Sequence, residues 1–201
     1  MKKNLKDAIQ DRRSYYQLKN TSPVSDDEIQ AIIEHVLLYA PSAFHSQSAR
    51  MVLLLGDNHT KMWEITKAEL KKVSKSEEAF KATEDKVNTS FASGYGTILF
   101  FEDKAVIKGL QNNLPTMAEK FTEWSGHSSA IAQVLTWIGL ESVGFGASLQ
   151  HYNPLIDEAI KKEWNLSQDW ELVAQMPFGE PAGEPGEKTQ VRLEERLFVV
   201  K

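Results

Sequence analysis

The chain has 201 residues, of which 41% are hydrophobic and 25% are charged. These fractions are typical of a folded globular protein and argue against a disordered or fibrous one. The formal net charge is −5 with both signs mixed along the chain, so no basic stripe predicts a nucleic-acid partner. The absence of cysteine excludes disulfides, zinc–thiolate sites and thiol catalysis.

The length suits a single domain over residues 1–201, or one protomer of an intertwined dimer. The first seven residues contain no apolar core and do not resemble a signal peptide. No apolar run approaches the roughly 20 residues that a membrane span requires. We therefore expect a soluble, cytoplasmic protein with no membrane partner.

The first predicted elements are helical. A short amphipathic segment covers residues 5–14. Ser25 and Glu28 then have the spacing of a capping box, which predicts the start of a helix. That helix should end before Pro41, because the residue preceding a proline disfavours helical backbone. A loop rich in hydrogen-bonding groups follows over residues 41–48.

The middle of the chain alternates apolar runs with charged stretches. Residues 51–55 and 97–101 are short, continuous and apolar, which is typical of buried strands. We predict one long charged helix over residues 60–86 and a short helix over residues 103–110. An alternation of apolar strands and amphipathic helices indicates an α+β or α/β sheet covered by helices.

The remaining predicted elements are, in chain order, a helix over 128–143, an extended segment over 146–152, a helix over 154–164 with Pro154 in its first turn, a strand over 171–179, a Pro/Gly-rich loop over 180–186 and a last strand over 196–200. Proline is tolerated in a first helical turn because its missing N–H would have no helical partner there.

The helix over residues 128–143 is apolar on nearly every side. Its helical stripe consists of Ile131, Val134, Leu135 and Ile138, and its opposite side carries Ala130, Ala132, Trp137 and Leu140. Such a helix has no face suited to water and must be buried on several sides. A second protomer would bury it economically; a central core helix of a monomer is the alternative.

Three segments carry groups suited to a ligand. Arg12, Arg13 and Ser14 form a small anion site if the cations converge, because guanidinium groups offer a fixed fork of donors to phosphate. The loop over 41–48 mixes donors and acceptors, as the edge of a planar heterocycle requires. Residues 144–152 contain glycines that let backbone approach a ligand, but neither a dinucleotide fingerprint nor a nucleophile elbow. Each segment alone is also compatible with ordinary surface or loop structure.

Taken in order, four motifs resemble the FMN-dependent nitroreductase family: R-R-S at 12–14, P-S-A-F-H-S-Q at 41–47, G-F-G-A-S-L-Q-H-Y-N-P at 144–154 and K-T-Q-V-R-L-E-E-R at 188–196. The resemblance extends over residues 9–200. It is closest to the small branch that includes the copper-induced bacterial nitroreductase and fungal fatty-acid-repression relatives. It implies an α+β fold with a mixed central sheet flanked by helices, and an intertwined homodimer with FMN at its interface.

The resemblance also implies which residues bind FMN: Arg12, Arg13, Ser14, Tyr16, Pro41, Ser42, Ala43, Phe44, His45, Gln47, Asn88, Ser148, Leu149, Gln150, His151, Lys188, Gln190 and Arg192. Arg12 and Arg192 would bind the phosphate, and Arg13 and Ser14 would support the phosphate or ribityl region. Residues 41–47 would line the ring, and residues 148–151 would run along it with a backbone amide facing N5. No metal is implied.

The chain departs from many family members at four positions, with His45 for Asn, Ser48 for Pro, and Tyr16 and Gln190 for Lys. A cation near flavin N1 stabilises the reduced ring, so losing such a lysine should alter the reduction potential. We hypothesise that Arg50, His45 or His151 supplies the missing charge.

By resemblance, NADH or NADPH passes hydride to FMN N5, and a nitroaromatic or quinone then takes the electrons in a ping-pong order, with a role in stress defence. No catalytic side chain is required, because the cofactor supplies the reactivity. Phe44 and Tyr152 are candidates to pack against the flat acceptor, although core packing explains them equally well. The alternative function is a stress or regulatory flavin-binding protein with little or no turnover.

Two other classes of site are disfavoured. Ser128 or Ser148 with a histidine would suggest a hydrolase, but neighbours in the sequence do not make a triad by themselves. A metal site built from His45, His127 and His151 lacks the H-E-x-x-H pattern.

Overall fold

The computed structural model describes residues 3–201; Met1 and Lys2, which begin the segment predicted not to be a signal peptide, lie outside the described residues. The helices are α1 (Leu5–Asp11), α2 (Asp26–Tyr39), α3 (Asp57–Val73), α4 (Glu77–Ser90), α5 (Lys104–Asn113), α6 (Ala118–Ser142) and α7 (Asp157–Glu163). The strands are β1 (Leu18–Lys19), β2 (Ala49–Leu55), β3 (Gly96–Asp103), β4 (Gly146–Ala147) and β5 (Trp170–Pro181). The predicted α+β class is confirmed.

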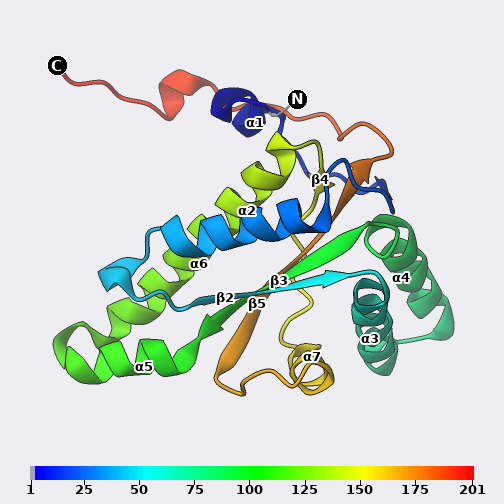
Figure 1. The fold of residues 1–201 in the computed structure, drawn as a ribbon, viewed down its shortest axis with the longest axis horizontal. Helices are drawn as coiled ribbons and strands as arrows, with labels where there is room; N and C mark the ends of the chain where they lie inside the picture. Colours follow the sequence, from blue (N-terminus) through cyan, green and yellow to red (C-terminus); the bar gives the residue numbers. More distant parts are fainter. Residues whose placement is uncertain (1–2) are drawn as a thin grey trace.

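The sheet has the order β1-β5-β3-β2, with β4 paired to β5, and Figure 1 shows it crossing the middle of the molecule. All ladders between these strands are antiparallel. The expected mixed sheet therefore needs correction: within residues 3–201, parallel pairing is limited to an isolated bridge between Ser14 and Ala147. The connections between paired strands are long: α3 and α4 lie between β2 and β3, and α5, α6 and α7 lie between β3 and β5.

Both faces of the sheet are covered by helices. On β3, Ile98 and Phe100 belong to a core cluster beneath α2 and α6. Leu99 and Phe101 point to the opposite face and pack in a second cluster beneath α3, α4 and α7. Because successive side chains of a strand alternate between faces, a strand covered on both sides must be apolar throughout. This confirms the buried strand predicted over residues 97–101.

The long helix predicted over residues 60–86 is wrong, because two helices, α3 and α4, occupy this region. The chain turns at residues 74–76, where Ser74 has extended backbone. The Ser76 hydroxyl accepts a hydrogen bond from the Ala79 backbone N–H at 3.2 Å and caps α4. A side-chain cap of this kind satisfies a donor that a new helix would leave without a partner.

Helix α6 begins at Ala118, ten residues before the predicted start. Its buried face carries many hydroxyl and amide side chains: Ser125, Ser128, Ser129, Gln133 and Thr136. The predicted apolar stripe lies on the outer side, where Val134 is 42% and Leu135 37% exposed. Polar residues at core positions conceal the helical periodicity, which explains why the predicted helix starts too late.

Two further predictions need correction. Helix α7 begins at Asp157, and Pro154 lies in the turn before it rather than in its first helical turn. The strand predicted over residues 196–200 is replaced by a short 3-10 turn over Leu193–Glu195 and an extended tail without a strand partner in the described chain. A short apolar run forms a strand only if a sheet edge lies within reach, and this segment leads away from the sheet (Figure 1). Among residues 3–201, none of the helices has the length and apolar character needed to cross a membrane.

Candidate functional site

The N-terminal arginine motif lies beside the glycine-rich segment at β4. Ser14 forms its bridge with Ala147, and the Tyr15 backbone N–H donates to the Ala147 carbonyl oxygen at 3.0 Å. Gly146 allows this approach, because a Cβ there would lie 2.9 Å from the Tyr15 ring. Two of the four sequence motifs therefore meet in the fold.

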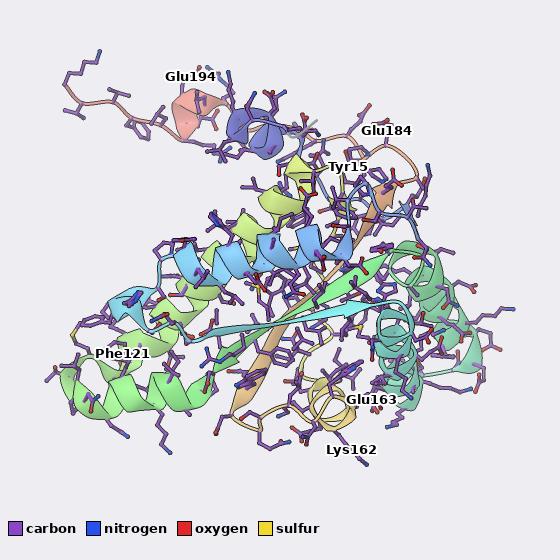
Figure 2. The ribbon with its side chains drawn as sticks, viewed as in Figure 1. Tyr15, Phe121, Lys162, Glu163, Glu184 and Glu194 are labelled. Atoms are coloured by element: carbon purple, nitrogen blue, oxygen red, sulfur yellow. The ribbon has the colours of Figure 1, made fainter. Side chains whose placement is uncertain are left out.

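A cavity of about 310 Å³ opens at this junction and is lined by Arg12, Arg13, Ser14, Tyr16, Gly186, Glu187 and Lys188. The Arg13 guanidinium donates a hydrogen bond to the Gly186 carbonyl oxygen, which ties the N-terminal motif to the segment after β5. Figure 2 shows Tyr15 and Glu184 on the two chain segments that meet here. Three cations and a hydroxyl form a donor set that matches phosphate, and the Glu187 carboxylate offsets part of their charge.

Arg12 is held by helix α6. Its guanidinium carbon lies 4.5 Å from the centroid of the Trp137 ring, a favourable cation–π geometry. One turn further along α6, Glu141 accepts a hydrogen bond from Lys3 at 2.6 Å. Burial raises the pKa of Glu141, while Lys3 and Arg12 act in the opposite direction. The indole and the neighbouring charges thus fix one side of the cationic cavity.

The segment after β4 continues along β5. Ser148 and Gln150 donate their backbone N–H groups to carbonyl oxygens of β5 at 3.2 and 2.7 Å. Because hydrogen-bonding direction alternates along extended backbone, Leu149 and His151 turn their amides away from β5. Gln175, fully buried on β5, accepts a hydrogen bond from the Tyr152 backbone N–H at 2.8 Å. Gln175 is not among the predicted site residues, although an amide in an otherwise apolar strand is a usable signal.

The loop over residues 41–48 adopts an unusual backbone. Phe44, His45 and Gln47 have φ values of 55°, 52° and 49°, which side-chain-bearing residues rarely adopt. The Ala43 backbone N–H donates to the Ser128 hydroxyl of α6 at 3.2 Å. Conformations of this kind persist only where surrounding contacts determine them, and they concentrate at functional sites.

The loop presents an aromatic surface. The Phe44 side chain is 56% exposed, stacks on Trp124 at 5.9 Å between ring centroids and meets Phe121 edge-on at 5.3 Å. Both partners lie on the part of α6 that the sequence analysis did not assign to a helix. Tyr152 instead packs against Trp63 and other rings of the core. Of the two candidate acceptor contacts, Phe44 is the one whose ring is more than half exposed.

Several predicted residues are not brought together within one chain. The 41–48 loop follows the C-terminal end of α2, whereas the cationic cavity lies near its other end, and 14 residues of helix span about 21 Å (Figure 1). Arg192 is 77% exposed on the extended tail, 3.5 Å from Glu194, and does not line the cavity. Gln190 is likewise exposed on the tail.

Two other positions have definite neighbours. Asn88 is exposed on α4, and its side-chain oxygen accepts a hydrogen bond from Lys67 at 2.8 Å. Three residues further along the chain, the ring of Phe91 lies 6.3 Å from the ring of Tyr16. Arg50, a candidate for the missing flavin charge, is paired with Asp103 at 2.9 Å. In the part of the chain that the structure describes, no group of His, Asp and Glu side chains could hold a metal ion.

A family model described as the nitroreductase family matches residues 9–180. The Saccharomyces cerevisiae protein HBN1 is 34% identical over 190 residues, which cover 93% of each chain. Nitroreductase CinD from Lactococcus lactis, solved with nicotinic acid, superposes with a TM-score of 0.89 at 40% identity, covering 98% of this chain and 100% of that one. The same enzyme solved with 4-nitrophenol gives 0.86 at 39% identity, with the same coverage.

A more distant nitroreductase from Desulfitobacterium hafniense, solved with bound FMN, shares the fold at 16% identity, with a TM-score of 0.72 and full coverage of both chains. The resemblance inferred from the four motifs is thus confirmed by a family match over most of the chain. In this chain, the arginine motif contacts the glycine-rich segment, and the fold that brings them together is shared with these proteins. The chain belongs to the nitroreductase family.

Proposed function

We propose that this chain is an FMN-dependent NAD(P)H oxidoreductase that reduces nitroaromatics or quinones. The supporting observation is the cationic cavity, in which Arg12, Arg13, Ser14 and Lys188 converge beside the segment that follows β4. When bound, FMN would supply the electron-transfer chemistry, and the protein would supply binding, orientation and electrostatics.

The residues present fit the chemical groups of this cofactor. Arg12, Arg13 and Lys188 would hold the phosphate through charge-assisted hydrogen bonds, with the Ser14 hydroxyl as a further donor. The outward-facing amides of Leu149 and His151 would direct donors toward the ring. NADH or NADPH and the acceptor would use the same surface in turn, which gives a ping-pong order.

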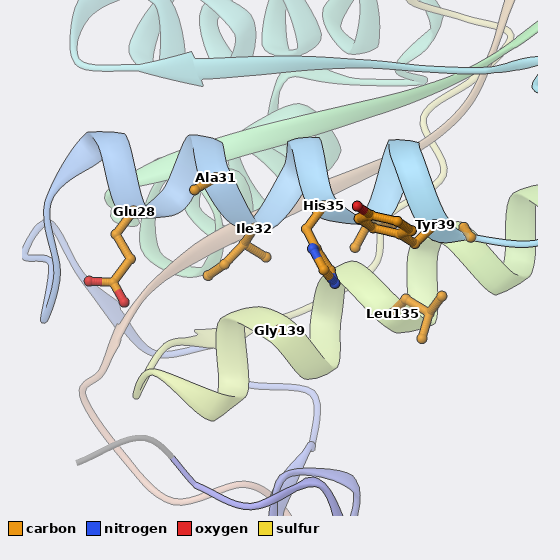
Figure 3. A pocket seen from close by; sticks show the side chains of 9 residues that line it. Glu28, Ala31, Ile32, His35, Tyr39, Leu135 and Gly139 are labelled. Carbon is orange, nitrogen blue, oxygen red and sulfur yellow. The ribbon is translucent and has the colours of Figure 1, made fainter.

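We also propose that the protein works as a homodimer. An apolar groove of about 530 Å³ lies between α2 and α6. Figure 3 shows the side chains of Ile32, His35, Tyr39 and Leu135 along it. Tyr39 is 70% and Leu135 37% exposed, which is unfavourable for an apolar face in water. A second chain would cover this face, and a two-fold axis could bring the 41–48 loop of one protomer to the cationic cavity of the other.

The acceptor is proposed to be a small planar aromatic. The exposed ring of Phe44, stacked on Trp124, offers a flat apolar surface at the ligand-facing loop. The structures of CinD with 4-nitrophenol and with nicotinic acid support this class of ligand for a relative at about 40% identity.

The decisive experiment is a spectroscopic titration of the purified protein. We expect flavin absorbance that is bleached by NADH or NADPH and restored by a nitroaromatic or quinone. Arg12→Gln should weaken FMN binding about 10- to 100-fold, because it removes a charge-assisted contact. Lys108→Gln, which removes a charge at an exposed position on α5, is the matched control and should bind FMN as the wild type does. A colourless protein that does not bind added FMN would contradict the proposal and favour a role without turnover.

A further inference from the structure

A buried carboxylate lies beneath the 41–48 loop, outside the cationic cavity. Glu102, near the end of β3, is 3% exposed. Its Oε2 accepts hydrogen bonds from the hydroxyls of Ser48 and Ser125, both at 2.7 Å. Its Oε1 is buried without a hydrogen-bond partner in residues 3–201. A carboxyl group that is removed from water and only half satisfied is costly, so its presence requires an explanation.

The two serines connect Glu102 to different parts of the fold. Ser48 is fully buried and directly follows Gln47, the last loop residue with positive φ. Its carbonyl oxygen also accepts the Asp103 backbone N–H at 2.9 Å, so both its side chain and its backbone are held at the end of β3. Ser125 belongs to α6 and has no such link with the loop. One carboxylate oxygen therefore ties the exit of the loop to the helix that packs behind it.

The loop is held at its entrance by the same helix. The Ser128 hydroxyl, three residues after Ser125 on α6, accepts the Ala43 backbone N–H at 3.2 Å. Between these two anchors, the His45 and Ser46 backbone N–H groups donate to carbonyl oxygens within the loop, at 2.9 and 3.1 Å. The strained backbone of Phe44, His45 and Gln47 is thus confined between two fixed ends.

The charge environment of Glu102 fits an anchor that stays buried. Burial raises the pKa of Glu102, and its hydrogen bonds with Ser48 and Ser125 oppose that shift. Arg50 on β2 and Lys104 on α5 also lower the pKa through their charge. The buried residues of α6 nearest to Ser125 are Phe121, Ser128 and Ser129, none of which carries a charge. A single oxygen of Glu102 accepts hydrogen bonds from two hydroxyls and so joins β3, α6 and the loop.

We propose that Glu102 is a positioning residue for the 41–48 loop: through Ser48, it holds residues 43–47 in the conformation that receives the cofactor. The proposal rests on the proposed function, which assigns this loop to the flavin. Glu102 itself does not touch the ligand. Its effect is preorganisation, because a loop already fixed in its bound conformation loses less entropy on binding.

Ser48→Ala and Ser125→Ala provide a matched pair for the test. Each substitution removes one hydroxyl with the same 2.7 Å bond to the same oxygen of Glu102, and the Ser48 hydroxyl also lies 3.3 Å from the Ser46 hydroxyl within the loop. If Glu102 only fills the core, the two variants should behave alike. If it positions the loop, Ser48→Ala alone should release the loop, while both variants lose thermal stability.

Two measurements distinguish these outcomes. In protein without added flavin, hydrogen exchange of the His45, Ser46 and Gln47 amides should accelerate about 10-fold in Ser48→Ala and less than about 2-fold in Ser125→Ala. In an FMN titration, Ser48→Ala should raise Kd about 10-fold, as expected for one lost buried hydrogen bond. Glu102→Gln keeps a carbonyl acceptor for Ser48 and should bind FMN within about 3-fold of the wild type.

Equal changes in the two serine variants, or no change in either, would overturn the positioning role of Glu102. If the wild type binds no FMN, the proposed function fails, yet the exchange measurement still decides whether Glu102 fixes the loop. The two proposals can therefore fail independently.

Discussion

His59 shows how a single buried residue links protonation to stability. It is 3% exposed on α3, with Nδ1 2.9 Å from the Thr97 hydroxyl and Nε2 3.2 Å from the Ala92 carbonyl oxygen. Thr97 also accepts the Trp63 indole N–H at 3.0 Å, so its own proton points to His59 Nδ1. This network assigns the neutral tautomer with the proton on Nε2, which donates to Ala92.

Burial lowers the pKa of His59, although the Ala92 hydrogen bond opposes this. A lowered folded-state pKa means that the unfolded chain binds the proton more readily, so stability is full above about pH 6.5 and falls as the pH drops below it. His59→Gln should be less stable than the wild type at pH 8 but lose less stability between about pH 7 and pH 5.5. Urea unfolding at several pH values measures this. His127→Gln, at an exposed position, should keep the wild-type slope, and an unchanged slope in His59→Gln would contradict the assignment.

At the scale of elements, Gly179 permits the close packing of strands beside the site. A Cβ on Gly179 would meet the Lys19 carbonyl oxygen of β1 at a separation that real Cβ atoms do not show, and it would lie 3.0 Å from the Tyr95 backbone nitrogen. Backbone atoms cannot move aside as a flexible side chain can. Since β1 follows directly from the arginine motif, this contact helps to place that motif against the sheet.

Gly179→Ala should therefore destabilise the protein by about 1–3 kcal/mol through overpacking. Gly126, inside α6, has no heavy atom within 4 Å of its would-be Cβ. Gly126→Ala should stabilise the protein by about 0.5–1 kcal/mol, because alanine loses less backbone entropy in a helix. Thermal unfolding of both variants provides the measurement, and a stabilised Gly179→Ala would show that the strands can separate at little cost.

The organisation of the whole molecule depends on the outer face of α6 and on the C-terminal tail. The tail leaves the body beside α1 and ends far from the sheet (Figure 1). Phe198 is 80% and Val200 95% exposed on it. Like the groove between α2 and α6, these side chains are apolar and exposed, which is typical of a surface that a partner covers. A partner chain is the proposed cover for both.

Leu135→Glu should convert the proposed dimer into a monomer and weaken FMN binding. The reason is that the carboxylate in the apolar groove would be buried at the dimer interface without an opposite charge to pair with. Val73→Glu introduces the same charge at a position that is 61% exposed on α3, and it should leave the dimer intact. Sedimentation velocity at several protein concentrations distinguishes the species. A wild type that sediments as a single chain at every concentration would refute the homodimer.

The sequence by itself determined the features that depend on local chemistry. The Ser25 cap marks the start of α2, and the apolar run at 97–101 identifies a strand buried on both faces. The order of four short motifs identified the family, because it does not depend on where each motif lies in space. Capping and strand burial patterns are properties of neighbouring residues, so they can be read along the chain.

Only the tertiary structure decided which side of α6 faces the core and what satisfies its polar groups. Ser125 could be buried because Glu102, 23 residues away, accepts a hydrogen bond from its hydroxyl, and the Ser48 hydroxyl donates to the same oxygen across 54 residues. Sequence periodicity predicts that such polar residues face solvent, because the pattern along a helix does not include a hydrogen-bond partner that is distant in the sequence. The same reasoning applies to the unpaired C-terminal tail, because an apolar segment becomes a strand only where the fold brings an open sheet edge to it.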